Sequence, residues 1–400
     1  MRILVNAASA KMGGALTYLK NVLRWAGEQA PEDHFLVYAP RSTQEQLEGK
    51  VASNIDVQPY PFADTGGVAR LLFDQVIIPR RIAEEAIDVL FSSTGFGTFV
   101  TSCPEVLLVR NPVYFDPTFQ AKYEELGRCL LRTKLRRWYS LLSIWRSDVT
   151  LFPTQAMEDM VGEHLSLTGK PTEVFHYGFD EDRFRDGAED SKWSRRMRHL
   201  KEKGDSILLN VSTYAVHKNF ETLVDALARL REQGHRVKLF TTTSREQTSD
   251  TEEYDELRRR AADRGVAEDW CEMGYVPYRQ LHSIYRAADV YVFPSFTESF
   301  GHSLVEAMAT GLPIVAADMP VNREVCGPAG RFFPTFDADR CAALIARLLE
   351  AEREWRELAQ ASLEHAEHFS WERHTEDLLS VLRQTVDQSR FQNGQPGDAC

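Results

Sequence analysis

Short apolar runs alternate with segments of helical periodicity along almost the whole chain, and this alternation restricts the fold more than any other feature. The runs in the first half are Ile3–Ala8, Phe35–Ala39, Asp88–Ser92, Val106–Val109, Val149–Pro153 and Glu173–Tyr177, and those in the second half are Ile207–Val211, Val237–Phe240, Met273–Val276, Val290–Phe293 and Ile314–Ala317. Most are continuous rather than alternating, which is typical of strands buried on both faces of a parallel sheet. The pattern therefore predicts an α/β protein with doubly wound parallel sheets.

The same pattern divides the chain into two domains of similar size. Strand and helix signals cover residues 1–185 and resume over 206–365, while the charged stretch 186–205 is poor in apolar residues, as in a linker with some helix. A helix over 366–386 is expected to pack back on the first domain, and the polar tail 387–400 is expected to be disordered. Because ligands of such sheets bind beyond the carboxyl ends of the strands, a shared site is expected in a cleft between the domains.

Composition and charge exclude several classes of protein. A hydrophobic content of 43% and a charged content of 26% are those of an ordinary soluble globular protein. The formal net charge of −12 argues against nucleic-acid binding, because phosphate backbones attract basic surfaces. The N-terminus shows no signal-peptide pattern, and no apolar run is long enough to span a bilayer. We therefore expect a cytoplasmic protein, lying at most on the inner face of a membrane.

The sequence predicts neither a metal site nor another cofactor. Its six cysteines are scattered without CxxC or other metal-ligand spacing, which favours reduced thiols over a disulfide framework. The triplet Asp180-Glu181-Asp182 has the formal DxD pattern of metal-binding sites, but it adjoins the linker, where a polar loop is expected. The pair Gly95 and Gly97 supplies only half of a GxGxxG motif, so a nicotinamide-dependent dehydrogenase is disfavoured.

A short stretch near residue 300 combines a strand end, a glycine turn and a helix start. The run Val290–Phe293 is followed by a proline, and a helical pattern starts near Ser303 and ends at the Gly-Leu-Pro of residues 311–313. Gly301 is therefore predicted to lie at a helix N-terminus beyond a strand's carboxyl end. Unpaired backbone N–H groups in that position bind phosphate.

Two acids bracket this glycine turn, and their spacing fits a sugar–diphosphate–nucleoside. Glu306 lies one turn inside the helix and can reach the hydroxyls of a ribose, whereas Glu298 can accept hydrogen bonds from hydroxyls on the other side of a diphosphate. A second interpretation stays open from the residues alone. Ser303-Leu-Val-Glu306 also has the pattern of a capping box, in which Glu306 would only bond the backbone N–H of Ser303.

This stretch resembles a known family. Glu298 to Glu306 has the E-x7-E spacing, and the region from Pro294 to Arg323 is similar to the donor-binding core of the retaining family-four glycosyltransferases (glycosyl transferases group 1). These have the GT-B fold, with two Rossmann-like domains facing a central cleft. The resemblance implies that Glu298 contacts the donor sugar and Glu306 the nucleotide ribose. It also implies that backbone amides hold the diphosphate and sugar, namely those of Phe300, Gly301, His302 and Ser303. Val276 is a further candidate for contact with the nucleoside.

The loop after the first run of the second domain matches the basic loop of the family. Lys218 lies just before a helix, at a strand's carboxyl end, where a cation can neutralise a leaving diphosphate; an ordinary solvated lysine is the alternative. Thr213 stands where the family usually has an arginine, so the diphosphate has one cation fewer. His217 could compensate if it were protonated, or it could pack or face water.

Three features of the first domain are assigned by the same resemblance, in chain order. Gly13-Gly14 matches the N-terminal glycine loop, whose helix N-terminus would point at phosphate or acceptor, although a tight turn explains it equally well. The segment Val149–Ala156 matches the end of the first domain. Arg110 takes the place of a histidine that the family often has near the acceptor, and an arginine cannot act as a base.

The segment Arg128–Arg146 is basic and has no acid, in an acidic protein. Its large apolar residues recur at helical spacing and form one face, namely Leu131, Leu135, Trp138, Leu142 and Trp145. Two interpretations remain open. The face can be buried against the core, which the sequence slightly favours, or it can lie on an anionic membrane as a peripheral contact.

Taken together, the residues and the resemblance predict a retaining glycosyltransferase that moves a sugar from a nucleoside diphosphate to a hydroxyl acceptor, a carbohydrate or a glycolipid. Polysaccharide or glycoconjugate assembly at the cell surface is the setting that the resemblance implies. The alternatives are a GT-B sugar-nucleotide epimerase and a catalytically weak binding or scaffold protein.

Overall fold

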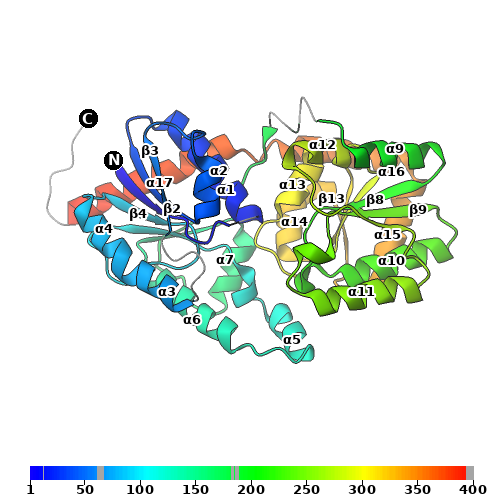
Figure 1. Cartoon of the computed structure of the whole chain (residues 1–400), viewed down its shortest axis with the longest axis horizontal. Helices are drawn as coiled ribbons and strands as arrows, with labels where there is room; N and C mark the ends of the chain where they lie inside the picture. The colour runs from blue at the N-terminus through cyan, green and yellow to red at the C-terminus, as the bar shows by residue number, and fades with distance from the viewer. Residues whose placement is uncertain (12, 61–66, 182–183, 185–188, 393–400) are drawn as a thin grey trace. The chain divides into compact units, whose positions relative to one another are not determined.

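The computed structural model describes residues 1–11, 13–60, 67–181, 184 and 189–392. The chain forms two compact units (Figure 1). The first unit consists of Met1–Asp116, Tyr123–Tyr177 and Trp371–Cys400, and the second consists of Pro117–Lys122 and Gly178–Ser370. Each is an α/β domain around one parallel sheet, as the alternation of runs predicts.

The first unit is built on a seven-stranded parallel sheet in the order β3-β2-β1-β4-β5-β6-β7. Its strands are β1 (Arg2–Asn6), β2 (His34–Ala39), β3 (Ile55–Pro59), β4 (Val89–Ser92), β5 (Glu105–Leu108), β6 (Val149–Phe152) and β7 (Thr172–Val174). The central strands β4, β5 and β6 are buried at every position, which explains their continuous apolar runs. Strand β3 was missed by the sequence analysis, because it lies at the sheet edge and alternates apolar with exposed polar residues.

Helices connect these strands, and the last helix of the chain joins them. They are α1 (Gly13–Gln29), α2 (Arg41–Leu47), α3 (Gly67–Leu72), α4 (Ile78–Glu84), α6 (Leu131–Arg146), α7 (Gln155–Gly162) and α17 (Trp371–Gln392), with a π-helical turn at Phe73–Ile77 and a 3-10 turn at Pro112–Tyr114. Helix α17 packs against α1, β4 and β5 (Figure 1). It continues to Gln392, so the expected disorder from residue 387 onward is wrong for 387–392, which extend the helix beyond the buried Val386. Residues 393–400 lie outside the described part of the chain.

Helix α6 contradicts the core-facing interpretation of the basic segment. Its inward face is small and mixed, with Ser140, Ser143 and Ile144 buried. The large apolar side chains of the opposite stripe are 60–63% exposed, namely Leu131, Leu135, Trp138 and Trp145, while Leu142 is partly buried. The sequence could not decide which face of the helix turns inward, because both faces can pack on a sheet.

The second unit is built on a six-stranded parallel sheet in the order β10-β9-β8-β11-β12-β13. Its strands are β8 (Ser206–Asn210), β9 (Val237–Thr241), β10 (Trp270–Glu272), β11 (Val290–Phe293), β12 (Ile314–Ala317) and β13 (Gly330–Phe333). The run Met273–Val276 is not a strand, because the edge strand β10 lies just before it and ends at Glu272. The short edge strand β13 was also missed.

The helices of the second unit cover its sheet on both sides (Figure 1). They are α9 (Lys192–Glu202), α10 (Phe220–Glu232), α11 (Thr251–Asp263), α12 (Tyr278–Tyr285), α13 (His302–Ala309), α14 (Pro320–Cys326), α15 (Ala338–Glu350) and α16 (Glu352–Ala366), with 3-10 turns at Val216–Lys218, Arg245–Gln247 and Gly327–Ala329. Helix α5 (Pro117–Glu125) begins in residues that group with this unit.

The predicted linker 186–205 is largely a structured part of the second unit. Helix α9 starts at a capping box formed by Ser191 and Ser194 and packs on β8 and α12, with Met197 fully buried. The sequence hides the helix's contact with the second unit, because most of its residues are charged and only Met197 is a buried apolar residue. Residues 186–188 lie outside the described part of the chain.

Candidate active site

Two loops meet at the carboxyl edge of the second unit's sheet. One follows β8 and ends at Asn219 before α10, and the other follows β11 and leads to α13; β8 and β11 are neighbours in the sheet. The carbonyl oxygen of His217 accepts a hydrogen bond from the backbone N–H of Phe296 at 3.0 Å and lies 3.1 Å from the hydroxyl of Ser295, whose single proton it shares with Glu298. The side-chain amide of Asn219 donates to the carbonyl of Pro294 at 3.1 Å. The two loops are therefore fixed in register.

This register brings Lys218 and Glu298 together across 80 positions of sequence. The Nζ of Lys218 lies 2.5 Å from Oε1 of Glu298, which also accepts from the Ser295 hydroxyl at 2.8 Å. Burial by itself would raise the pKa of Glu298, but the charge of Lys218 and these hydrogen bonds outweigh it, and the pKa is lowered. Glu298 is therefore ionised at neutral pH and partly compensates the lysine.

The turn before α13 has the conformation that the sequence predicts. Gly301 adopts φ +85° and ψ 64°, the left-handed region, and a Cβ there would lie 2.9 Å from Cδ1 of Leu304. Helix α13 begins at His302, and no side chain caps its N-terminus. Its N-cap residue, Gly301, has no side chain, and backbone N–H groups at a helix N-terminus attract anions.

Glu306 is buried in the second unit and its carboxylate does not cap the helix. Oε2 accepts a hydrogen bond of 2.9 Å from the hydroxyl of Tyr285, which lies on α12. The capping-box interpretation of Ser303 and Glu306 is therefore wrong, because helix α13 starts two residues earlier than that pattern requires. Burial raises the pKa of Glu306 to about 7, although the hydrogen bonds from Tyr285 and Tyr278 lower it.

The loop after β8 carries one cation rather than two. Burial and the neighbouring charge of Lys218 lower the pKa of His217 to about 4, so the imidazole is neutral at pH 7. The expectation that a protonated His217 could replace the family's arginine is therefore wrong. Thr213 is exposed on the same loop.

The remaining predicted residues of this unit lie around α13 and α12. Phe300 is fully buried against Phe369, with ring centroids 5.8 Å apart, so only its backbone faces the turn. His302 and Ser303 open α13 and are partly exposed. Val276 is buried in the loop between β10 and α12.

Gly13, Gly14 and Arg110 belong to the first unit and lie at the carboxyl edge of its own sheet. Gly13, with φ +59°, and Gly14 start α1 and are exposed. Arg110 follows β5 by two residues and is partly exposed.

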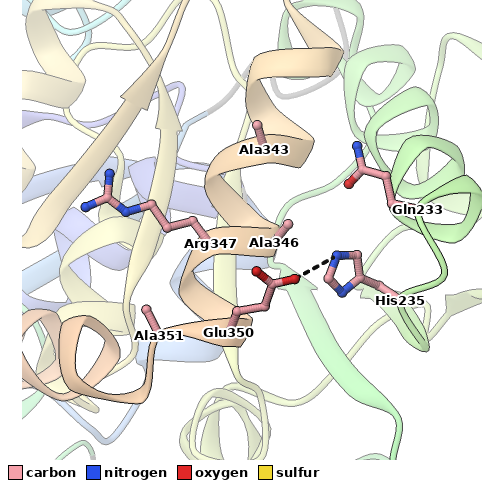
Figure 2. A pocket seen from close by; sticks show the side chains of 7 residues that line it. All are labelled: Gln233, His235, Ala343, Ala346, Arg347, Glu350 and Ala351. Carbon is pink, nitrogen blue, oxygen red and sulfur yellow. Dashed lines mark ion pairs between the residues drawn. The ribbon is translucent and has the colours of Figure 1, made fainter.

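A pocket of the second unit lies away from these loops. A hollow of about 550 Å³ is lined by Gln233 and His235, which precede β9, and by residues of α15 and its end (Figure 2). His235 and Glu350 form an ion pair of 3.6 Å across it. It adjoins the amino end of β9, opposite the loops that carry Lys218 and Glu298, so we do not assign the chemistry to it. Among the residues that the structure describes, no three His, Cys, Asp or Glu side chains gather as a metal ion requires.

A family model matches this part of the chain. The model for "Glycosyl transferases group 1" covers residues 191–365, which include β8 to all but the last residue of α16 and both loops that carry Lys218 and Glu298. Residues 191–365 form a glycosyl transferases group 1 domain. The glycosyltransferase domain thus contains Lys218, Glu298, Gly301 and Glu306.

Curated relatives and solved structures agree with this assignment. O-antigen chain mannosyltransferase B of Escherichia coli is 37% identical over 131 residues, covering 32% of this chain and 34% of the relative. Mannosylfructose-phosphate synthase of Agrobacterium fabrum is 26% identical over 247 residues, covering 60% of this chain and 54% of the relative. The matched segments thus span about a third to a half of these relatives. Both names support a transferase.

The fold is that of GT-B glycosyltransferases. HepE of Anabaena, solved in complex with UDP-glucose, superposes with a TM-score of 0.74 at 17% identity, covering 96% of this chain and 100% of that one. Sucrose-phosphate synthase of Thermosynechococcus elongatus superposes with a TM-score of 0.76 at 18% identity, covering 96% and 98%. The predicted fold is confirmed.

Three residues that position this site were missed by the sequence analysis. Ser295 orients Glu298, Asn219 joins the loops from a left-handed conformation (φ 53°), and Tyr285 holds Glu306. Asn219 could have been found, since asparagine is the residue most often tolerated there. Tyr285 gives no local signal, because it lies 21 positions from its partner.

Glu306 predicts a pH-dependent affinity for nucleoside diphosphates. If its carboxylate accepts ribose hydroxyls, binding should weaken as the pH falls through about 7, because the neutral form dominates below that value. The limit is about tenfold per pH unit. Glu306→Gln should bind about ten- to a hundredfold more weakly at pH 8 and lack this dependence. Isothermal titration calorimetry of the wild type and of Glu306→Gln from pH 5.5 to 8.5 measures the difference in affinity. Protonation of the ligand affects both proteins equally and drops out of the comparison.

Tyr285→Phe provides the matched control. Because the tyrosine hydroxyl lowers the pKa of Glu306, its removal should shift the midpoint to higher pH without abolishing it. If the affinities of the wild type and Glu306→Gln for the nucleotide changed with pH in the same way, Glu306 would not contact the nucleotide.

Proposed function

We propose that the protein is a retaining glycosyltransferase that moves a sugar from a nucleoside diphosphate sugar to a hydroxyl group of a carbohydrate or glycolipid. The observation that carries the proposal is the Lys218–Glu298 ion pair beside the uncapped N-terminus of α13, inside the glycosyl transferases group 1 domain. A cation and a helix N-terminus at one sheet edge suit a diphosphate. The adjacent carboxylates suit the hydroxyl groups of a sugar.

In this proposal the site acts by electrostatics. The backbone of Phe300 to Ser303 and the ammonium group of Lys218 hold the diphosphate as its negative charge grows. Glu298 binds hydroxyls of the transferred sugar, and Glu306 binds the ribose, with Val276 beside it. Thr213 offers a hydroxyl where a second cation is lacking, and His217 contributes its carbonyl to the loop rather than a charge.

Retention follows from attack on the face that the diphosphate leaves. The bond between the anomeric carbon and the phosphate oxygen breaks as the acceptor oxygen bonds to that carbon. The departing phosphate oxygen takes the proton of the acceptor hydroxyl. The ion pair takes part in this step. Before the donor binds, the ammonium group of Lys218 contacts the Glu298 carboxylate, and it can move toward the diphosphate as negative charge develops there.

The donor class is supported by a neighbour of the same fold, since the HepE structure contains UDP-glucose. Polysaccharide or glycoconjugate assembly is supported by the name of the Escherichia coli relative, an O-antigen chain enzyme. We place the reaction in the cytoplasm, at the inner face of a membrane. Gly13, Gly14 and Arg110 are the contacts proposed for the first unit.

A screen of sugar nucleotides tests the proposal directly. A cognate donor should raise the melting temperature of the protein. Without an acceptor, a retaining transferase should hydrolyse this donor slowly and release the sugar with its anomeric configuration unchanged. An epimerase would instead return an isomerised sugar nucleotide, and a scaffold protein would give no turnover. Absence of both binding and hydrolysis with every common donor would refute the assignment.

Lys218→Ala should lower kcat by about a hundredfold to a thousandfold, with a smaller effect on donor affinity, because the charge matters most as the diphosphate leaves. Lys238→Ala is the matched control, since Lys238 forms an ion pair of the same length with Asp269 near the amino end of β9. Steady-state kinetics of the two variants separates the roles. A near-normal rate for Lys218→Ala would exclude it from the mechanism.

Helix α6 supports the membrane location. Its stripe of exposed Leu and Trp side chains is flanked on the helix by arginines and a lysine, with no acid, in a chain of net charge −12. Val100, 73% exposed, adjoins the end of the helix, because the carbonyl of Phe99 accepts from Arg146. No helix in the described part of the chain is long and apolar enough to cross a bilayer. Apolar side chains between cations suit an anionic lipid surface.

Trp138→Ala combined with Leu135→Ser should weaken binding to vesicles containing anionic lipid by at least tenfold, since each buried side chain contributes about 1.5–3 kcal/mol. Tyr275→Ala, which removes an aromatic residue 77% exposed in the other unit, is the control and should bind as the wild type does. Vesicle co-sedimentation measures both. Binding of the double variant at wild-type strength would contradict a role for α6.

A further inference from the structure

Arg110 is a cation at the carboxyl edge of the first unit's sheet, and it has no counter-charge within the described part of the chain. It follows β5, whose neighbours in the sheet are β4 and β6, and it lies beyond the carboxyl end of the strand. Ligands of parallel α/β sheets bind at this edge.

The guanidinium group of Arg110 rests on an aromatic cluster. Its central carbon lies 5.4 Å from the ring centroid of Tyr18, a fully buried residue of α1. Tyr18 in turn packs edge-on against Tyr177, Trp371 and His374, with centroids 5.0–5.8 Å apart. The ring face holds the guanidinium in place and leaves its N–H groups, which lie in its plane, free to bond elsewhere.

None of these neighbours compensates the charge. Burial raises the pKa of Tyr18 and Tyr177 and lowers that of His374 to about 4, so all three are neutral at pH 7. The buried Nη1 of Arg110 has no hydrogen-bond partner, and no ion pair of Arg110 occurs among residues 1–11, 13–60, 67–181, 184 and 189–392. The residue as a whole keeps part of its surface exposed, so a ligand can reach it.

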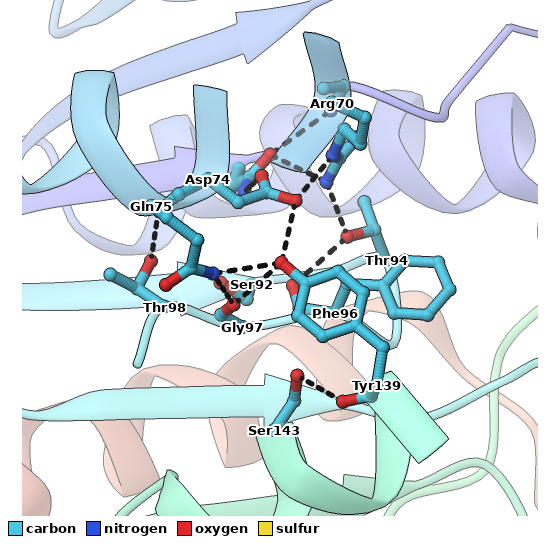
Figure 3. Close-up of polar contacts among 12 residues, drawn as sticks. Arg70, Asp74, Gln75, Ser92, Thr94, Phe96, Gly97, Thr98, Tyr139 and Ser143 are labelled. Atoms are coloured by element: carbon cyan, nitrogen blue, oxygen red, sulfur yellow. Dashed lines mark hydrogen bonds and ion pairs between the residues drawn. The ribbon is translucent and has the colours of Figure 1, made fainter. Parts of the chain in front are cut away.

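Arg70 of the same unit is a structural arginine and provides a comparison (Figure 3). Its Nε donates to Oδ2 of Asp74 at 2.7 Å, and its Nη2 donates to the hydroxyl of Thr94 at 2.9 Å. Asp74 is itself fully buried and accepts from the amide of Asn6 at 2.8 Å. Arg70 is thus paired and hydrogen-bonded, whereas Arg110 has neither a carboxylate nor another acceptor among the residues that the structure describes.

An uncompensated, partly desolvated cation is costly to the free protein, because hydrogen bonds to water have been lost and nothing has replaced them. Such a loss of stability is typical of a binding residue, because its hydrogen-bond partner is supplied by the ligand. A guanidinium group matches the two oxygens of a phosphate or carboxylate.

We propose that Arg110 is a receptor for an anionic group, a phosphate or a carboxylate, carried by a substrate. The identity of that substrate rests on the proposed function. On the acceptor side, the anion would select a phosphorylated or acidic acceptor over a neutral sugar. The same chemistry could also come from the donor diphosphate, and the experiment below separates the two sources.

Binding of inorganic phosphate, followed by titration calorimetry and by thermal shift, tests the site without any turnover. Arg110→Met fits the aromatic surroundings but removes the charge, and it should weaken phosphate binding by about ten- to a hundredfold. Arg110→Lys should restore part of the affinity. Lys218→Ala should retain the Arg110-dependent component. Phosphate binding that is lost in Lys218→Ala and intact in Arg110→Met would overturn the proposal and leave the proposed function standing.

Stability of the ligand-free protein provides a second, independent readout. Arg110→Met should leave the melting temperature unchanged or raise it, because an uncompensated cation is removed, whereas the matched variant Arg70→Met should lower it by stranding Asp74. A fall for Arg110→Met as large as that for Arg70→Met would show a structural arginine and refute the receptor.

The source of the anion follows from the affinity for UDP. An equal loss of UDP and phosphate affinity in Arg110→Met supports a receptor for the donor, and an unchanged UDP affinity supports a receptor for the acceptor. Failure of sugar transfer with an intact Arg110-dependent phosphate response would count against the proposed function alone.

Discussion

The carbonyl oxygen of His217 is the point on which the proposed site depends. It accepts a hydrogen bond from the Phe296 backbone in the loop after β11, and the Ser295 hydroxyl of that loop, which also contacts Glu298, lies 3.1 Å from it. Buried backbone groups that lack partners are costly, so these bonds strongly favour one register of the two loops. With that register set, Lys218 meets Glu298 and the turn at Gly301 presents the start of α13. A shift of either loop would separate the ion pair.

The two acids of the E-x7-E stretch acquire opposite electrostatic characters from their surroundings. Glu306 is buried and Glu298 is mostly so, and burial alone disfavours the charged form of each. Glu298 faces the ammonium group of Lys218 and is held ionised, whereas Glu306 has tyrosine hydroxyls as partners and its pKa rises to about 7. The difference suits the proposed roles, since one carboxylate is shared with a cation and the other is kept for neutral hydroxyls.

The first unit distributes its charges by the same principle, with a different outcome. Arg70 and Asp74 neutralise each other inside a network of hydrogen bonds, which stabilises the edge of the sheet. Arg110 is left against the ring of Tyr18 without an anion. Helix α6 likewise turns its largest apolar residues toward solvent. In a folded domain, groups left unsatisfied in this way point to partners outside it.

The amino-acid sequence by itself determined the class of fold and the order of its elements. Continuous apolar runs identify β4, β5, β6, β11 and β12, because strands buried on both faces are mostly apolar at every position, and the glycine turn at 301 identifies the start of α13. These are local signals, carried by neighbouring residues. The apolar runs do not identify the edge strands β3, β10 and β13, because a strand at a sheet edge can carry exposed polar residues that interrupt the run.

Only the tertiary structure decided the states of the individual site residues. It excluded the capping box by placing Tyr285 against Glu306, made His217 neutral by burying it beside Lys218, and turned the apolar stripe of α6 outward. The physical reason is the same in each case. A side chain's charge, partner and exposure are set by residues that lie dozens of positions away in the chain, and a sequence read along its length contains no distance between them.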